Sequence, residues 1–231
     1  MHGLLNFASV VLQAPVGRYY AAMKFFRRRA AAVARGQMSA NSEVHLWATA
    51  RPVYEKWFTF LLRNEPVHPR QQGFRATNFS LFTDASKAGY GSVLVSNDTG
   101  LILSFGSAWD AADEAKHINT REALAVTKSV YHFSDYLTGA NVHVFIDNTS
   151  AKGALERGYS RSSELNDAVV EALAALKIVN SVTASYVASE DNPSDPRSRG
   201  KFDWSAGEII AATQDVSLAS GADGRWGLVK G

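Results

Sequence analysis

Three strand patterns follow one another between residues 78 and 109, with no helical stretch between them. They cover Asn78–Asp84, Gly89–Ser96 and Leu101–Trp109, and a polar turn from Asn97 to Gly100 joins the last two. Connections this short join antiparallel neighbours, because a parallel crossover needs about a dozen residues or more. We therefore expect an antiparallel meander.

Helical and strand patterns alternate after this meander. Helices are expected at Asn119–Tyr136, Thr149–Glu156, Ser163–Val179 and, more weakly, Trp204–Thr213, and strands at Val142–Asp147 and Val182–Val187. The order β-β-β-α-β-α-α-β-α predicts an α/β fold in which a mixed five-stranded sheet carries helices on its faces.

Two further helical patterns precede the meander. The first runs from Gly17 to Arg35 and is amphipathic and basic, and the second runs from Ser42 to Arg63. The loop that follows contains two prolines and marks a boundary. We expect three parts: a basic helical segment at 1–70, a sheet domain at 75–215 and a flexible tail at 216–231.

Charge is divided unevenly between these parts. Residues 1–70 hold ten Lys or Arg against three Glu, a net +7, whereas residues 71–231 hold fourteen against nineteen acids, a net −5. A basic arm on an acidic body favours a polyanionic partner, with Arg27, Arg28 and Arg29 as candidate contacts. A solvated helix face explains the same arginines without any partner.

The chain has no cysteine, which excludes disulfides, thiolate zinc sites and cysteine nucleophiles and fits a reducing compartment. No apolar run reaches the ~18 residues that a membrane span needs, so no membrane association is expected. The compartment stays open. Cytoplasm or nucleus is expected, but the first 42 residues are free of acids and also resemble an organellar import signal.

Four acids stand at strand ends or helix starts of the predicted sheet: Asp84, Glu122, Asp147 and Asp195. Each also fits a structural role. Asp84 suits the turn before a glycine-rich hairpin, Asp147 and Asp195 suit helix N-caps, and Glu122 suits a capping box. In that capping box, Asn119 would be the N-cap.

The joint arrangement of the acids is harder to explain by structure alone. Ligand sites of α/β sheets gather where strands end and helices begin. Four carboxylates converging there would repel one another unless cations neutralised them, and oxygen ligands favour Mg²⁺ or Mn²⁺ over zinc. The sequence therefore predicts a divalent-metal site.

Four blocks of sequence resemble, in order, those of the ribonuclease H domain in retroelement reverse transcriptases. They are Phe82–Gly91 (FTDASKAGYG), Ile118–Glu122 (INTRE), Phe145–Asn148 (FIDN) and Asp191–Arg199 (DNPSDPRSR). The resemblance covers about residues 75–205. The second and fourth blocks are similar to the DIRS/VIPER group of retroelements. Gly3–Ser9 with Gly17 and Arg18 resembles the thumb and connection that follow a polymerase palm.

This resemblance implies an endoribonuclease that cuts the RNA strand of an RNA/DNA hybrid with two Mg²⁺ ions, for which Mn²⁺ can substitute. Asp84 and Asp147 would share the metals, Glu122 would hold the ion on the leaving-group side, and Asp195 the ion that activates water. Its partners would be the hybrid and the polymerase portion of the same polyprotein. Candidate contacts to sugars or phosphates are Ser86, Asn119 and Asn148, for which turn and cap roles are the alternative.

The sequence departs from the family pattern at two points, and two alternative functions stay open. The segment Val187–Asp191 lacks the histidine that cellular enzymes carry before the last acid, which predicts slower turnover. The chain lacks a Tyr-Met/Val-Asp-Asp motif, so no polymerase chemistry is expected. A catalytically silent hybrid-binding module of connection type is the first alternative, and another nuclease on the same fold is the second.

Overall fold

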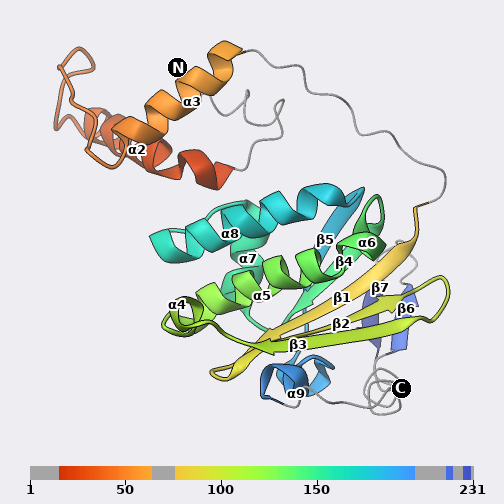
Figure 1. The fold of residues 1–231 in the computed structure, drawn as a ribbon. Coiled ribbons are helices and arrows are strands. Elements are labelled where there is room, and N and C mark those ends of the chain that lie inside the picture. Colours follow the sequence, from red (N-terminus) through yellow and green to blue (C-terminus); the bar gives the residue numbers. More distant parts are fainter. Residues whose placement is uncertain (1–15, 64–75, 201–216, 221–225, 230–231) are drawn as a thin grey trace. The chain divides into compact units, whose positions relative to one another are not determined.

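The computed structural model describes residues 16–63, 76–200, 217–220 and 226–229, and these are shown as ribbon in Figure 1. The chain divides into two compact units, Met1–Arg70 and Gln71–Gly231. Within the described ranges, no helix is both long enough and apolar enough to cross a membrane.

The first unit contains η1 (Val16–Tyr19), α2 (Tyr20–Ala34) and α3 (Arg51–Arg63). Its core is aromatic. The rings of Tyr19 and Trp57 lie 4.6 Å apart, and Trp57 is 1% exposed. The rings of Phe25 and Trp47 meet edge to face at 5.2 Å.

The second predicted helix starts later than expected. The prediction placed its start at Ser42, whereas α3 begins at Arg51. Pro52 explains the difference, because proline is tolerated in the first turn of a helix but breaks a helix in its interior.

The sheet of the second unit has the order β3-β2-β1-β4-β5. The first three strands pair antiparallel, and β1, β4 and β5 pair parallel, so the predicted mixed five-stranded sheet is confirmed. The strands are β1 (Asn78–Ala85), β2 (Gly89–Ser96), β3 (Ile102–Ala108), β4 (Asn141–Ile146) and β5 (Ser181–Tyr186).

Helices pack on both faces of this sheet, and Figure 1 shows α5, α7 and α8 on one face and α9 on the other. The helical elements are α4 (Ala111–Glu114), α5 (Ile118–His132), α6 (Ser134–Leu137), α7 (Thr149–Arg157), α8 (Ser163–Ala175), η2 (Leu176–Ile178), η3 (Ser189–Asp191) and α9 (Asp195–Ser198). Of these, α4, η3 and α9 lie outside the predicted helical ranges, whereas α6 and η2 fall at the ends of predicted helices.

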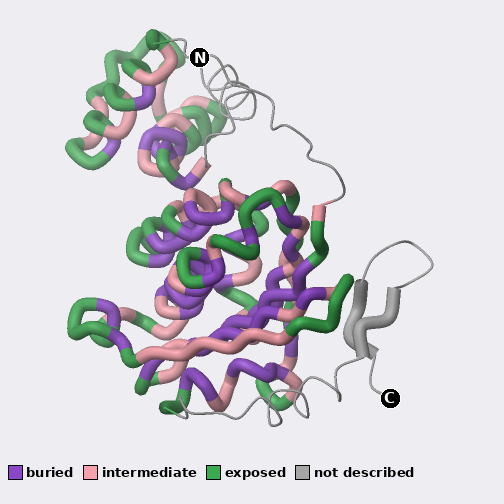
Figure 2. The backbone as a smooth tube through the Cα atoms, turned by 45° about the vertical axis from the view of Figure 1, so that its right-hand side comes forward, coloured by how far each residue is buried: buried purple, intermediate pink, exposed green. Residues whose placement is uncertain are grey.

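Burial follows from this layering. β1 is buried along nearly its whole length, as expected for a central strand covered on both faces. Figure 2 shows buried residues both in the middle of the sheet and along the helices that cover it. Leu81 belongs to the large core beneath α5 and α8, whereas Phe82 and Phe145 stack at 4.6 Å in a smaller core on the opposite face. Asp84 has the same strand parity as Phe82 and so lies on the side of α9.

Near the C-terminus, β6 (Ser217–Ser220) pairs antiparallel with β7 (Trp226–Val229). Sequence patterns did not predict these strands, and the flexibility of residues 216–231 stays a prediction. The predicted helix at Trp204–Thr213 lies outside the described residues.

Candidate metal site

Asp84 and Asp147 come from neighbouring parallel strands. The register of β1 and β4 pairs Thr83 with Ile146, so the next residue of each strand brings the two aspartates side by side. Asp84 is 3% exposed. Asp147 directly follows β4, and the N-cap of α7 is its neighbour Asn148, whose side chain accepts a hydrogen bond from the amide of Ala151. The N-cap role considered for Asp147 is therefore wrong.

Glu122 comes from the second turn of α5 and is 3% exposed. The N-cap of α5 is His117, whose Nδ1 accepts a hydrogen bond from the amide of Asn119. Because Asn119 is already inside the helix, the capping box proposed for Asn119 and Glu122 is wrong. One oxygen of Glu122, Oε2, is buried without a hydrogen-bond partner among the described residues.

Asp84, Glu122 and Asp147 form one cluster, in which one carboxylate oxygen from each lies within 4.8 Å of the others. Three converging carboxyl groups, one with a buried oxygen that lacks a partner among the described residues, fit a hard divalent cation, because such ions take oxygen ligands. The ligands available in this cluster are all carboxylates, which matches Mg²⁺ or Mn²⁺ better than zinc.

The electrostatics of the cluster show how unfavourable it is without a cation. Burial, and secondarily the carboxylates of Asp147 and Asp84, raise the pKa of Glu122 to about 10. Burial also raises the pKa of Asp84 to about 7, against the opposing effect of a hydrogen bond from Ser198, and Asp147 and Asp195 add to the increase. Both acids therefore hold protons more readily than usual until a cation replaces them.

Asp195 is the first residue of α9, whose N-cap is Ser194, so the N-cap role considered for Asp195 is wrong. Its carboxylate forms a two-pronged ion pair with Arg199. Nε of Arg199 lies 2.9 and 2.8 Å from the two oxygens, and Nη2 lies 2.7 Å from Oδ1. Among the described residues, Asp195 is not part of the three-acid cluster.

Helix α9 is nevertheless fixed against the cluster. The hydroxyl of Ser198 donates to Oδ2 of Asp84, and Nδ2 of Asn192 donates to the carbonyl of Thr83 at 3.0 Å. The approach is close. A β-carbon added to Gly91 would lie 2.5 Å from the carbonyl oxygen of Ser194 and 2.6 Å from the amide nitrogen of Ser198. Gly91 therefore allows α9 to pack on β2.

The candidate nucleic-acid contacts in this unit already have protein partners. The hydroxyl of Ser86 donates to the carbonyl of Ser198 and accepts from the amide of Ala88. Nδ2 of Asn148 donates to Oδ1 of Asn119 at 2.9 Å. Since Asn119 Oδ1 is the acceptor in this pair, its amide nitrogen remains as a donor for another group.

Two of the three candidate arginines in the first unit contact aromatic rings. The guanidinium of Arg28 lies 5.3 Å from the Trp47 ring centroid, and that of Arg29 lies 5.4 Å from the Phe25 ring centroid. These distances are within the range of cation–π interactions. Arg27 is exposed.

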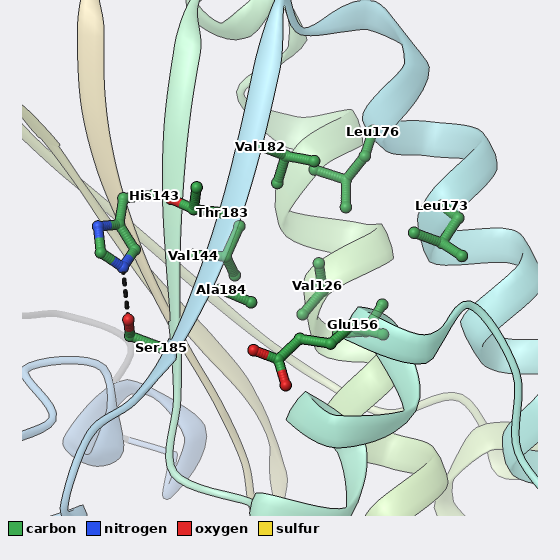
Figure 3. A pocket seen from close by; sticks show the side chains of 11 residues that line it. Val126, His143, Val144, Glu156, Leu173, Leu176, Val182, Thr183, Ala184 and Ser185 are labelled. Carbon is green, nitrogen blue, oxygen red and sulfur yellow. Dashed lines mark hydrogen bonds between the residues drawn. The ribbon is translucent and has the colours of Figure 1, made fainter. Parts of the chain in front are cut away.

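A separate cavity of about 820 Å³ lies at the β5 side of the domain (Figure 3). Its lining is mainly aliphatic, and Glu156 contributes a carboxylate that is paired with Lys152 at 2.8 Å. Nε2 of His143 lies 2.7 Å from the hydroxyl of Ser185 at this cavity. None of the four candidate acids lines it, so the acid cluster is the better candidate for chemistry.

Sequence reasoning assigned no role to Ser198 or Arg199, although both lie in the fourth block. Their spacing carried the signal. Ser198 and Arg199 follow Asp195 by three and four residues, a spacing that places side chains on one face of a helix. Once a helix was expected to begin at Asp195, both residues could have been placed beside it.

Residues 75–176 match the family model described as "RNase H-like domain found in reverse transcriptase". The match includes Asp84, Glu122 and Asp147 and ends before Asp195. No curated protein matches the sequence significantly.

Similar solved structures include two RNase H domains. RNase H1 from the archaeon Halobacterium salinarum is 16% identical, with a TM-score of 0.41. The match covers 49% of the present chain and 86% of the archaeal chain. The N-terminal RNase H domain of a Mycobacterium tuberculosis protein is 16% identical, with a TM-score of 0.46. This match covers 60% of the present chain and 98% of the mycobacterial chain. A foamy viral protease-reverse transcriptase in complex with double-stranded DNA is 12% identical with a TM-score of 0.39, covering 80% of this chain and 31% of its own. Identities this low transfer no activity.

Proposed function

The chain contains an RNase H-like domain of the type found in reverse transcriptases, and from this premise we propose that it is an endoribonuclease that hydrolyses the RNA strand of RNA/DNA hybrids. The observation that carries the proposal is the cluster of Asp84, Glu122 and Asp147, with oxygens within 4.8 Å of one another. Two of these acids, Asp84 and Glu122, are buried with raised pKa values, which costs folding free energy and favours a functional reason for the cluster.

The chemistry follows from what these side chains can hold. Two divalent ions bound here would activate a water molecule and stabilise the leaving 3′ oxygen of the cut phosphodiester. Asp84 and Asp147, adjacent across the strand pair, are suited to share both ions. Glu122 would hold the ion on the leaving-group side, and Asp195 the ion on the side of the attacking water.

The surrounding residues would position the hybrid. The side-chain amide nitrogen of Asn119, for which the described residues supply no hydrogen-bond acceptor, is suited to donate to a sugar or phosphate oxygen, and Asn148 fixes its orientation through the 2.9 Å hydrogen bond. Contacts to 2′-hydroxyls across a wide minor groove distinguish RNA from DNA by shape, without sequence preference. The hydroxyl of Ser86 supports the hairpin and α9, so its part in binding would be indirect.

We place this activity in retroelement reverse transcription, beside the polymerase portion of the same polyprotein. The support is the family match together with the sequence blocks that resemble the DIRS/VIPER group. The basic segment 1–70 would then act as a thumb or connection that holds the nucleic acid, in the cytoplasm or nucleus.

The test is a cleavage assay with end-labelled RNA in an RNA/DNA hybrid, with and without Mg²⁺, and with duplex DNA and duplex RNA as controls. We expect Mg²⁺-dependent cutting of the RNA in the hybrid alone, leaving 5′-phosphate and 3′-hydroxyl ends. Tight hybrid binding without cutting in either Mg²⁺ or Mn²⁺ would instead favour the silent connection-type module.

A further inference from the structure

Asp195 is the one candidate ligand that lies outside the three-acid cluster of the described residues. Both of its oxygens contact the guanidinium of Arg199, at distances between 2.7 and 2.9 Å. A planar guanidinium that meets a carboxylate in this two-pronged manner fixes its orientation as well as its charge. Arg199 therefore holds the Asp195 carboxylate more closely than the Ser189 hydroxyl does, which lies 3.5 Å from Oδ1.

The backbone around Asp195 cannot be the reason that the carboxylate stays apart. Ser198 anchors the same turn of α9 to Asp84 through its hydroxyl. Ser198 Oγ also lies 2.9 Å from the carbonyl oxygen of Asp195. The turn of α9 that begins at Asp195 is thus anchored to Asp84 of the cluster.

The charges of two cluster acids, Asp84 and Asp147, also act on Arg199. Its pKa is raised, first by the hydrogen bonds from its guanidinium to Asp195 and then by the charges of Asp195, Asp84 and Asp147. The side chain of Arg199 is 62% exposed, so solvent can receive it if it leaves. A cation already on the protein therefore partly neutralises these acids.

We propose that Arg199 is a positioning residue that competes with a divalent metal ion for Asp195, so that the second metal site is complete only after Arg199 releases this carboxylate. The proposal rests on the proposed function in one respect, because it requires that the acid cluster binds divalent cations. It adds a built-in competitor that weakens the second site in the absence of substrate.

The competition predicts a measurable gain of metal affinity when Arg199 is removed. A largely exposed ion pair stabilises by a small amount, so its loss should strengthen binding of the weaker ion by about two- to fivefold. Arg199→Lys keeps the charge but cannot form the two-pronged contact, so its affinity should fall between the wild type and Arg199→Ala.

The experiment is a Mn²⁺ titration of the full chain, without nucleic acid, followed by electron paramagnetic resonance of the free ion. Arg161→Ala is the matched control, because it removes the same charge from an exposed residue of the loop before α8. We expect the wild type to bind one Mn²⁺ ion tightly and a second one weakly. The affinity for the second ion should rise in Arg199→Ala and stay at the wild-type value in Arg161→Ala. Asp195→Asn should lose the weaker ion.

Two results would overturn the proposal, and they differ in whether the proposed function fails as well. If Arg199→Ala and Arg199→Lys bind the weaker ion as the wild type does, or less tightly, Arg199 is not a competitor and the proposed function is unaffected. If Asp84→Asn binds Mn²⁺ as well as the wild type does, the acid cluster is not the metal site, and the proposed function fails together with this inference.

Discussion

Glu122 combines three properties that a purely structural glutamate rarely has together. It is 3% exposed, one of its oxygens has no hydrogen-bond partner in the described parts of the chain, and its pKa is raised to about 10. An unpartnered buried carboxylate costs folding free energy. A bound cation would remove that cost, which is the simplest physical reason for keeping such a residue.

Replacing either shared ligand should abolish cleavage while preserving the fold. Asp84→Asn and Asp147→Asn keep the size of the side chain but lose the charge that holds a divalent ion. We expect less than about one tenth of wild-type cleavage of the hybrid, with an unchanged circular dichroism spectrum. In EDTA the variants should melt at or above the wild-type temperature, because repulsion within the cluster falls. Near-wild-type cleavage by either variant would remove that residue from the ligand set.

The variant Glu122→Gln tests whether Glu122 acts as a metal ligand or only packs in the fold. Since His117 is the N-cap of α5, no capping role remains to explain Glu122. We expect an inactive but folded protein, assayed on the labelled hybrid at saturating Mg²⁺. An active Gln variant would show that the charge of Glu122 is not needed.

The same variant should change how stability depends on pH. Because the pKa of Glu122 is about 10 in the fold and near 4.3 in an unfolded chain, the folded state binds more protons between these values. Stability without metal should therefore fall as pH rises from about 5 to 9, by at most ~1.4 kcal/mol per pH unit for one proton. Glu122→Gln should show a shallower slope in EDTA, and Mn²⁺ should flatten the wild-type slope. Parallel slopes for the two proteins in urea denaturation would contradict the assignment.

At the scale of elements, α9 is a four-residue helix that depends on its contacts with the sheet. A helix of one turn does not form by itself in water, because nucleation is unfavourable. The hydrogen bonds from Asn192 and Ser198 to β1, together with the close approach at Gly91, hold it in place.

Gly91→Ala should therefore displace α9. The added methyl group would lie 2.5 Å from the carbonyl oxygen of Ser194 and from the β-carbon of Arg197, and overpacking of this kind costs about 1–3 kcal/mol. We expect lower stability in urea and loss of the weaker Mn²⁺ ion. Gly153→Ala is the control, because its β-carbon would meet only the end of the Arg157 side chain, within helix α7. That change should be neutral or stabilising by about 0.5–1 kcal/mol, and equal losses in both variants would argue against the role of Gly91.

The five strands of the main sheet were predictable to within about one residue because their burial pattern is local, whereas β6 and β7 were not predicted. β2 begins and ends at the predicted residues, Gly89 and Ser96. Helix starts were less predictable, since several polar residues compete for each cap. His117 caps α5 in place of Asn119, and Asn148 caps α7 in place of Asp147. These choices depend on the tertiary position of the helix, which residue type alone does not specify.

The candidate site also has a part that the sequence predicts and a part that it does not. Three acids could be brought together from the sequence because each stands near the end of a strand or the start of a helix in one domain, and the structure places one oxygen of each within 4.8 Å of the others. The state of Asp195 could not be predicted in this way. Its pairing with Arg199 depends on side-chain rotamers at the surface of α9, which the sequence pattern does not specify.

At the scale of the whole chain, the uneven charge of the two units leads to a prediction about binding. Changing Arg27, Arg28 and Arg29 together to Ala should weaken hybrid binding and flatten its salt dependence by about 0.9 units for each phosphate that is no longer neutralised. Cleavage at saturating hybrid should change little. The measurement is hybrid affinity between ~50 and 200 mM salt.

Lysine substitutions at the same three positions are the control. They retain the charge and should keep the salt slope, although the interactions of Arg28 with Trp47 and of Arg29 with Phe25 would be weakened. If the alanine variant keeps the wild-type slope, these arginines only solvate and stabilise the first unit.

The register of β1 and β4 has a consequence for how the chain acquires this site during folding. The pairing joins Asn78 to Asn141, which are 63 residues apart, whereas β1, β2 and β3 are neighbours in sequence. A slip of one residue would turn Asp147 to the opposite face from Asp84. Long-range pairs form after local ones because their loop closure costs more entropy. In a refolding time course, the capacity to bind Mn²⁺ should therefore appear after the hairpins, which makes a bound ion a reporter of when the central parallel pair locks into register.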